Sequence, residues 1–303
     1  MTERIEKPLL TIAIPTYNRA VHLDAQLQWA ITSIAGRWAQ CQLLVSDNAS
    51  TDETPAVCEK WRAQLGDKLQ IVRQPGNLGL AGNIAFCINQ AAGEYVWTVS
   101  DDDVMRPCAV TTVLAALSAR PELALLHMNF RSVDAPSGRV TKDRFYKHSE
   151  DRYAASAITL VEECLLDNDA GILFMSVNVL KRALAVDSLS KWPEAAQNLA
   201  LPMYVAAYVA ARGPMSLLVE PVCDAMLARP SWADRDVAIL FKEIPEIYRQ
   251  LIKIGYDRRL MHKLIRKRVK FEFVIFKALV KFLLKFPFEF VCTVPYYLSA
   301  IKD

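Results

Sequence analysis

Short apolar segments alternate with amphipathic segments along the first part of the chain, and this alternation restricts the fold more than any other feature. The apolar segments are rich in side chains that suit buried parallel strands, and they span residues 9–14, 42–46, 70–73 and 95–100. Apolar residues recur every three or four positions across residues 20–35, 54–65 and 80–92, which predicts helices between the strands. This β-α-β-α-β-α-β order is typical of an open, doubly wound α/β sheet.

Polar residues follow each of the four predicted strands. They are Pro15-Thr16-Tyr17-Asn18-Arg19, the run from Asp47 to Asp52, the run from Arg73 to Asn83, and Asp101-Asp102-Asp103. Right-handed crossovers bring the carboxyl ends of parallel strands to one edge of the sheet, where ligands of such sheets bind. We therefore expect all four groups to line one cleft.

The three consecutive aspartates predict a divalent cation site. Adjacent carboxylates repel one another unless a cation or basic neighbours neutralise them. Mg²⁺ or Mn²⁺ takes one or two protein carboxylates and completes its shell with water and phosphate oxygens. Alternation along the strand end points Asp101 and Asp103 to the same side. The alternative interpretation is a solvated acidic turn that caps a helix beginning near Pro107.

Residues after the first two strands suit a nucleotide, but they also suit turns. Asp47 can accept a hydrogen bond from a ring N–H of a base, and Thr16 and Tyr17 offer a hydroxyl and an aromatic face. A helix cap or an Asx turn explains the short spacing of Asp47, Ser50 and Asp52 as well.

The second half of the chain has a weaker pattern. A helix is expected from about residue 107 to 118, a strand over residues 123–128, and a hairpin turn from Asp134 to Gly138. Apolar segments return at residues 171–180, 199–211 and 216–221. We expect this half to bind the second substrate of a reaction whose first substrate occupies the cleft.

The ordered motifs resemble those of glycosyltransferase family 2. They read A-I-P-T-Y-N-R, V-S-D-N-A-S-T-D-E-T, N-L-G-L-A-G-N and W-T-V-S-D-D-D, and lie within residues 9–115. The resemblance implies an α/β fold of the GT-A type, a Rossmann-like mixed sheet flanked by helices. It also implies a nucleotide-diphosphate sugar as donor, more often UDP- or dTDP-linked, with Mn²⁺ or Mg²⁺ as cofactor.

The same resemblance assigns roles to residues of the cleft. The implied metal ligands are Asp103 and Asp101, with Asp101 nearer the ribose. Thr16, Tyr17 and Asp47 would contact the nucleoside. The full set of implied donor-binding residues is Pro15, Thr16, Tyr17, Arg19, Asp47, Asn48, Arg73, Asn77, Gly79, Asn83, Asp101 and Asp102.

The inverting reaction of the family implies a direct displacement, in which the metal stabilises the departing nucleoside diphosphate. A carboxylate must take the proton of the acceptor hydroxyl. In the family it is usually an Asp, often within a Glu-Asp pair downstream of the aspartates, and this sequence has no such pair there. Glu194 is the expected base, with Asp169 and Asp187 as alternatives, although each also suits a surface or capping carboxylate.

The C-terminal part is basic. From residue 230 onward there are 15 Lys/Arg and 8 Asp/Glu, although the whole chain carries only +3. Lysines interleave with Phe and Leu between residues 258 and 285, which favours a helix lying on an anionic membrane surface through residues 258–303. The alternative is a helix that packs on the catalytic domain or a subunit. No nucleic-acid motif accompanies the charge.

Three parts are expected: a nucleotide-sugar-binding half (1–110), an acceptor-binding half of the same domain (111–229) and a basic helical extension (230–303). Seven scattered cysteines indicate neither a disulfide framework nor a zinc site, and the first apolar run is too short for a signal peptide. We therefore expect a cytoplasmic protein, peripheral at the cytoplasmic face of the inner membrane.

The predicted activity is sugar transfer to a hydroxyl of a glycan or lipid-linked glycan in bacterial surface polysaccharide synthesis. A sugar nucleotidyltransferase or a dinucleotide dehydrogenase would require a glycine-rich loop after the first strand, and residues 15–19 contain no glycine. A non-catalytic nucleotide-binding scaffold of the same fold is the other alternative, because the Glu-Asp pair is missing.

Overall fold

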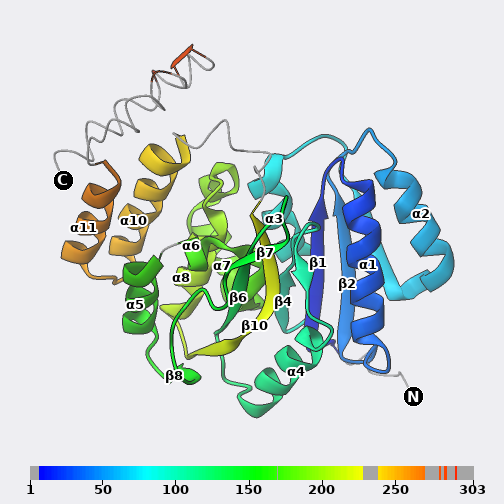
Figure 1. Cartoon of the computed structure of the whole chain (residues 1–303), viewed down its shortest axis with the longest axis horizontal. Helices are drawn as coiled ribbons and strands as arrows, with labels where there is room; N and C mark the ends of the chain where they lie inside the picture. The colour runs from blue at the N-terminus through cyan, green and yellow to red at the C-terminus, as the bar shows by residue number, and fades with distance from the viewer. Residues whose placement is uncertain are drawn as a thin grey trace.

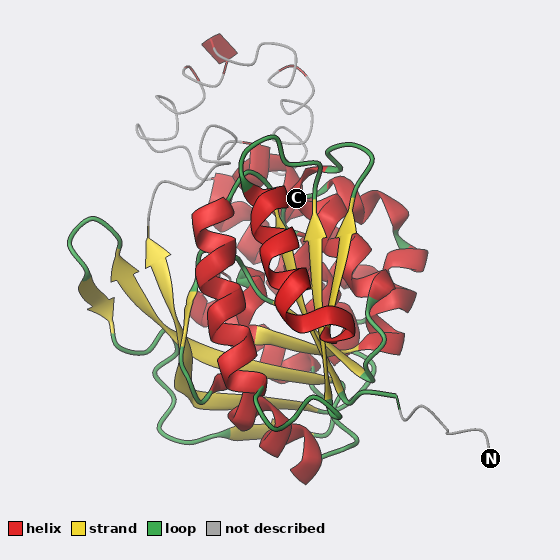
Figure 2. Cartoon of the chain, turned by 90° about the vertical axis from the view of Figure 1, so that its right-hand side faces the viewer, coloured by secondary structure: helices red, strands yellow, loops and turns green. Residues whose placement is uncertain are grey.

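The computed structural model describes residues 7–168, 170–227 and 238–269, together with positions 280, 283, 284 and 291. Helices cover both faces of one large sheet (Figure 1; Figure 2). The strands are β1 (Leu10–Thr16), β2 (Cys41–Asp47), β3 (Leu69–Arg73), β4 (Tyr95–Thr98), β5 (Val104–Met105), β6 (Leu125–Asp134), β7 (Arg139–Lys142), β8 (Arg152–Ala154), β9 (Asn178–Lys181) and β10 (Met215–Leu227).

The helices connect these strands or pack at one end of the sheet. They are α1 (Ala20–Ile34), α2 (Thr54–Leu65), α3 (Gly79–Gln90), α4 (Ala109–Ala119), α5 (Ile158–Asn168), α6 (Ala170–Leu173), α7 (Arg182–Lys191), α8 (Leu201–Ala210), α10 (Ile244–Lys253) and α11 (Arg258–Val269). Short 3-10 turns are η1 (Gly66–Lys68), η2 (Met175–Val177) and η3 (Pro193–Gln197), and η5 (Ile239–Glu243) is a turn of π-helix.

The first four major strands form the parallel part of the sheet, in the order β3-β2-β1-β4. The register sets Thr16 beside Asp47 and Asp47 beside Arg73, so these strands end level with one another. All four strands and the three helices between them lie where the periodicity predicted them. The local pattern was sufficient here because each strand and the helix that follows it are adjacent in the chain.

The remainder of the sheet is mixed. β9 is antiparallel to β4 and to β6, whereas β10 is parallel to β6 and antiparallel to β5. The α/β fold with a mixed sheet flanked by helices is therefore confirmed. β6 extends beyond the predicted strand to Asp134, since it continues into a hairpin with β7 at the predicted turn.

Successive side chains along each strand point to opposite faces of the sheet, and a hydrophobic core lies on each face. Leu10, Ile12 and Ile14 of β1 pack with α1 and α4, whereas Ala13 of the same strand packs on the face covered by α3 and α8. Side chains of period two on a strand point to opposite faces, so a strand buried on both faces is apolar throughout. This explains the continuous apolar run of β1.

The carboxyl ends of the parallel strands and the start of α3 lie along one edge of the molecule, the upper edge in Figure 1. The helical hairpin of α10 and α11 packs at the end of the molecule opposite α2 (Figure 1). None of the helices in the described ranges is long and apolar enough to cross a membrane.

Candidate active site at the strand ends

The end of β1 contacts the three aspartates directly. Thr16 Oγ1 donates a hydrogen bond of 2.7 Å to Asp101 Oδ2, and Arg19 pairs with Asp102 Oδ2 at 2.7 Å. These partners are more than eighty residues apart in sequence, and they meet because β1 and β4 are neighbouring parallel strands. We call Thr16, Arg19, Asp47 and Asp101 to Asp103 the strand-end cluster.

Two of the three aspartates are buried. Asp101 and Asp103 are 9% and 7% exposed, and Ser176 Oγ of η2 donates a bond of 2.6 Å to Asp103 Oδ2. Burial raises the pKa of Asp101 to about 6, although the hydrogen bond from Thr16 and the charge of Arg19 act in the opposite direction. Burial raises the pKa of Asp103 to about 8, opposed by the bond from Ser176 and reinforced by its acidic neighbours. A cation bound beside these two carboxylates would favour their ionised forms.

Asp102 has different surroundings. Its side chain is 39% exposed, Ser100 Oγ donates to its Oδ1 at 2.6 Å, and Arg19 donates to its Oδ2. Partial burial acts to raise the pKa of Asp102, but the bonds from Ser100 and Arg19 outweigh it and hold the pKa below its usual value. Asp102 is thus ionised and is the aspartate most open to a ligand from solvent.

The end of β2 is organised by Asp47. This carboxylate is 1% exposed, accepts a bond of 2.9 Å from the Ser50 N–H, and lies 3.3 Å from Arg73 Nη1 at the end of β3. Arg73 also donates to the Ser50 carbonyl at 2.8 Å. The bond to Ser50 is the turn that the spacing suggested, while the half-exposed Arg73 keeps a cation beside the cleft.

The start of α3 is held by Asn48. Its Nδ2 donates to Asn77 Oδ1 at 2.9 Å and to the Gly79 carbonyl at 3.2 Å, and its Oδ1 accepts a bond of 2.8 Å from the Leu78 N–H. Gly79 has a φ of 74°, which only glycine adopts without strain. The hydrogen bonds among Asn48, Asn77 and Gly79 therefore fix the backbone at the rim of the cleft.

The predicted donor residues differ in accessibility. Tyr17 is 42% exposed, so its ring faces the solvent side of the cleft, whereas Pro15 is buried within β1. Asn83 is 2% exposed, accepts a bond from Ser46 Oγ and donates to the Ser46 carbonyl at 3.0 Å. Asn83 thus fixes α3 against β2 from inside, behind the strand-end cluster.

The two candidate bases that the structure describes, Glu194 and Asp187, form no contact with the strand-end cluster that the structure records. Glu194 is an exposed residue of η3, and Asp169 lies outside the described residues. Asp187 accepts a hydrogen bond from the Tyr208 hydroxyl, which holds the pKa of this carboxylate below its usual value.

Sequence reasoning missed Ser176, which binds both Asp103 and the Ser100 N–H. It also missed Glu243, a carboxylate that is 5% exposed. No motif surrounds either residue, and only the tertiary structure brings Ser176 to the aspartates.

The oxygen donors of the aspartates suit a hard divalent cation. Within the described ranges no three His, Cys, Asp or Glu side chains are grouped as a closed metal cage. A site with only one or two protein carboxylates requires further oxygens from water and a phosphate-bearing ligand, as Mg²⁺ sites commonly do. Asp103 forms no ion pair with a described Lys or Arg, and its pKa is raised first by burial and then by the charges of Asp102 and Asp101.

The comparisons with known proteins agree with this geometry. The model of the family described as "Glycosyl transferase family 2" matches residues 11–163, which is half of the chain. Abequosyltransferase RfbV of Salmonella typhimurium is 28% identical over 117 residues, 39% of this chain and 35% of that protein. A GalNAc(5)-diNAcBac-PP-undecaprenol beta-1,3-glucosyltransferase of Campylobacter jejuni is 31% identical over 108 residues, 35% of this chain and 34% of that protein. The chain thus matches about a third of the length of these curated relatives.

Solved structures show the same fold over nearly the whole chain. S. aureus TarS 1-349 in complex with UDP-GlcNAc superposes with a TM-score of 0.65 at 15% identity, covering 97% of this chain and 88% of that chain. Mannosyltransferase PcManGT from Pyrobaculum calidifontis, in complex with GDP-Man and Mn²⁺, gives a TM-score of 0.56 at 17% identity, covering 98% and 86%. The expected GT-A architecture is confirmed.

Proposed function

The chain belongs to glycosyltransferase family 2, and we propose that it transfers a sugar from a nucleoside-diphosphate donor to a hydroxyl of a glycan or lipid-linked glycan, with inversion. The observation that carries the proposal is the strand-end cluster at the carboxyl edge of the parallel strands, in which Thr16 contacts Asp101 and Arg19 contacts Asp102. Relatives that are bacterial glycosyltransferases support a role in surface polysaccharide synthesis.

The donor would lie across the ends of β1, β2 and β4. Tyr17 offers an exposed ring to the base, and Asp47 and Thr16 offer polar groups to the nucleoside, preferably uridine or thymidine. Arg19 and Arg73 flank the aspartates and offer charge to the diphosphate. The UDP-GlcNAc in the structure of TarS supports a UDP-linked donor for this chain as well.

Asp103 and Asp101 would hold Mn²⁺ or Mg²⁺ together with diphosphate oxygens. When bound, the cation would offset the negative charge that develops on the departing diphosphate. The chain itself contributes Ser176 and Thr16, whose hydroxyls fix one oxygen of each carboxylate and leave the other for a ligand. The Mn²⁺ in the mannosyltransferase structure is consistent with this assignment.

Donor turnover tests the proposal. Purified protein is incubated with UDP- and dTDP-sugars, with Mn²⁺ or with a chelator, and the released nucleoside diphosphate is measured. We expect release only with the metal, and a loss of at least about 1000-fold in Asp103→Ala protein that still unfolds cooperatively. Equal turnover by that variant would remove the proposed metal site, and binding without turnover of any donor would favour the scaffold alternative.

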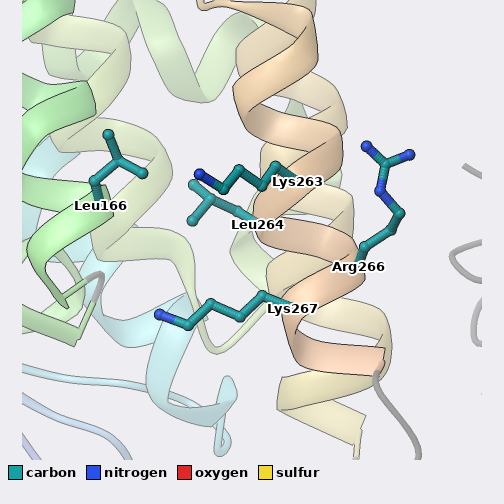
Figure 3. Close-up of a pocket in the computed structure, with 5 residues that line it drawn as sticks. All are labelled: Leu166, Lys263, Leu264, Arg266 and Lys267. Carbon is teal, nitrogen blue, oxygen red and sulfur yellow. The ribbon is translucent and has the colours of Figure 1, made fainter.

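The membrane-facing part of the proposal concerns α11. Leu166 of α5 and Leu264 line an open pocket of about 480 Å³ with Lys263, Arg266 and Lys267 of α11. Lys263 and Lys267 extend toward Leu166, whereas Arg266 points to the other side of the helix (Figure 3). Cations beside apolar side chains suit an anionic membrane surface, and α11 would sit at the cytoplasmic face of the inner membrane.

Vesicle sedimentation tests this part. Lys263→Glu with Lys267→Glu should weaken binding to vesicles containing phosphatidylglycerol by about tenfold or more, since each basic residue contributes about 1 kcal/mol. Lys60→Glu with Lys68→Glu makes the same charge change in α2 and η1 at the opposite end of the molecule, and should change binding less. Equal losses of vesicle binding in both double variants would show that binding depends on the net charge of the protein and not on the lysines of α11.

A further inference from the structure

One buried carboxylate lies outside the strand-end cluster. Among the described residues, the Asp and Glu side chains below a tenth of full exposure are Asp47, Asp101, Asp103 and Glu243. The first three meet at the strand ends, while Glu243 is the last residue of the π-helical turn η5 and is 5% exposed. Burying a carboxylate is costly unless hydrogen bonds compensate, and such groups concentrate at functional sites. Turns of π-helix are also frequent at functional sites.

Glu243 is fixed at the start of α8. Its Oε2 accepts a hydrogen bond of 2.7 Å from the Leu199 N–H, and its own carbonyl accepts one of 3.1 Å from Asn198 Nδ2. The same Asn198 nitrogen lies 3.4 Å from Glu246 Oε2, and Asn198 Oδ1 accepts a bond of 2.8 Å from the Ala200 N–H. We call Asn198, Glu243 and Glu246 the α8 cluster.

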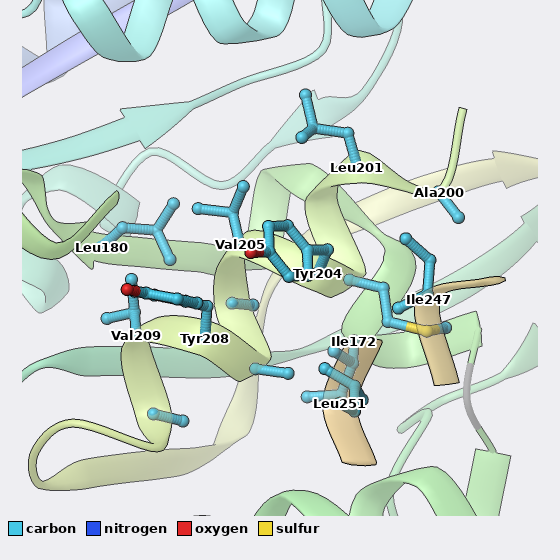
Figure 4. Packing of buried hydrophobic residues seen from close by; sticks show 14 of the residues in the cluster. Ile172, Leu180, Ala200, Leu201, Tyr204, Val205, Tyr208, Val209, Ile247 and Leu251 are labelled. Atoms are coloured by element: carbon cyan, nitrogen blue, oxygen red, sulfur yellow. The ribbon is translucent and has the colours of Figure 1, made fainter. Parts of the chain in front are cut away.

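Apolar packing keeps η5 in register with α8. Ile247, one helical turn after Glu243, belongs to the same buried core as Ala200 and Leu201 (Figure 4). Ile247 is fully buried, as are Ala200 and Leu201. The carboxylate of Glu243 is therefore held in one place by a packed interface rather than by a surface loop.

The start of α8 adjoins two elements that build the cleft. On one side, η3 packs on α3. The two elements approach so closely that a methyl group at Gly82 of α3 would lie 3.7 Å from the Ala196 carbonyl oxygen of η3. On the other side, α6 packs on α8 and leads into η2, whose Ser176 binds Asp103. The starts of α3 and α10 also lie along the same edge of the molecule (Figure 1). The α8 cluster thus lies next to elements that also contact or lead to residues of the strand-end cluster, in the half of the chain expected to bind the acceptor.

From this placement we infer that Glu243 is the general base that activates the acceptor hydroxyl, an inference that rests on the proposed function. The carboxylate of Glu243 takes the hydroxyl proton as the acceptor oxygen forms a bond to the anomeric carbon. The bond between that carbon and the diphosphate oxygen breaks, and its electron pair stays with the diphosphate. The proton on Glu243 then passes to water after products leave.

Glu243→Gln separates this role from a purely structural one. The amide oxygen of Gln can still accept the Leu199 N–H bond and occupies nearly the same volume, so the start of α8 keeps its contact. Gln cannot take a proton. We expect kcat to fall by about 100-fold or more, with the donor KM and the UDP affinity changed by less than about threefold.

Two matched controls complete the experiment, which uses the full chain and whichever nucleotide sugar the wild-type protein turns over. Glu246→Gln alters the neighbouring carboxylate of the α8 cluster, and Glu194→Gln alters the exposed carboxylate of η3. Glu246→Gln should retain kcat within about threefold, whereas Glu194→Gln tests the base that the sequence predicted. The wild-type profile of kcat/KM should fall on the acid side of its optimum, and Glu243→Gln should make that acid limb less steep.

The outcomes are distinct. Glu243→Gln protein with wild-type kcat would overturn the inference, as would a large loss confined to Glu194→Gln, which would place the base on η3. Loss of UDP affinity and of cooperative unfolding in Glu243→Gln would show a structural role instead. Wild-type protein that turns over no nucleotide sugar would contradict the proposed function itself rather than the choice of base.

Discussion

The strand-end cluster and the α8 cluster both gather carboxylates at one edge of the molecule, but their surroundings differ. The first is partly open, with Asp102 39% and Arg19 27% exposed, and its carboxylates are held by hydroxyls and a guanidinium. The second is closed around Glu243, whose contacts include the Leu199 N–H and the Asn198 amide. An open cluster of mixed charge suits a charged ligand arriving from solvent, whereas a closed one suits a single group held in a fixed position.

The contrast predicts that the α8 cluster matters more for stability. Asn198 is 4% exposed, and Asn198→Ala would leave the Glu243 carbonyl and the Ala200 N–H without this partner. Each unsatisfied buried group costs about 1–3 kcal/mol, so we expect the free energy of unfolding to fall by about 3 kcal/mol. Thr16→Val, which removes one bond in the strand-end cluster, should cost about 1 kcal/mol.

Urea unfolding followed by circular dichroism measures both variants. A loss in Thr16→Val equal to or larger than that in Asn198→Ala would contradict the expectation that the closed α8 cluster contributes more to stability than the open strand-end cluster.

A buried imidazole in β6, outside both clusters, allows a test of stability against pH. His127 of β6 is fully buried, and its Nδ1 lies 2.7 Å from Asn178 Oδ1. Asn178 Nδ2 donates to two backbone carbonyls, which fixes the amide and makes His127 Nδ1 the donor. Burial lowers the pKa of His127 to about 4, against the bond to Asn178, which raises it.

The sign of the effect follows from linkage. The unfolded histidine binds a proton below about pH 6.5 while the folded one stays neutral, so stability is present above that pH and is lost as pH falls toward 4. We expect His127 to account for about 2 kcal/mol of destabilisation between pH 6.5 and 4.5. In the His127→Gln variant this part of the decrease in unfolding free energy with falling pH should disappear, whether or not the variant is less stable than the wild type at neutral pH. Thermal melts across the range measure it, and an unchanged slope would reject the assignment.

The smallest expected effect concerns Arg19. The pair between Arg19 and Asp102 is partly exposed, and such pairs contribute about 0–1 kcal/mol to stability. Arg19→Gln should therefore unfold almost as the wild type does, while its affinity for UDP falls by about tenfold because a charge beside the diphosphate is lost. Calorimetric titration with UDP and Mn²⁺ measures the affinity. A large loss of stability with unchanged affinity would reverse the roles assigned to the two clusters.

The donor half could be predicted closely because its signals are local. Each strand is followed directly by its polar residues, so one rule about parallel strands placed Thr16, Asp47 and the aspartates together. The rule did not separate Asn83, which faces the interior, from Asn48, which shapes the rim. That distinction depends on the rotation of α3 about its axis, which periodicity fixes only approximately.

The acceptor half could not be predicted to the same degree. The expected bases were selected by their position in the chain, which favoured Glu194. Glu243 accepts a hydrogen bond from the Leu199 N–H, forty-four residues away in the sequence, and no local sequence pattern predicts this contact. The predicted membrane-binding residues 258–303 lie only partly within the described ranges, which include α11.

The sequence alone determined the family, the parallel strands and the edge at which polar residues gather, because strand and helix periods and the residues that follow them are properties of short segments. The tertiary structure decided which carboxylates are buried, which hydroxyls hold them and which distant glutamate reaches α8. Burial and hydrogen bonding depend on elements far apart in the chain, and only packing brings those elements together.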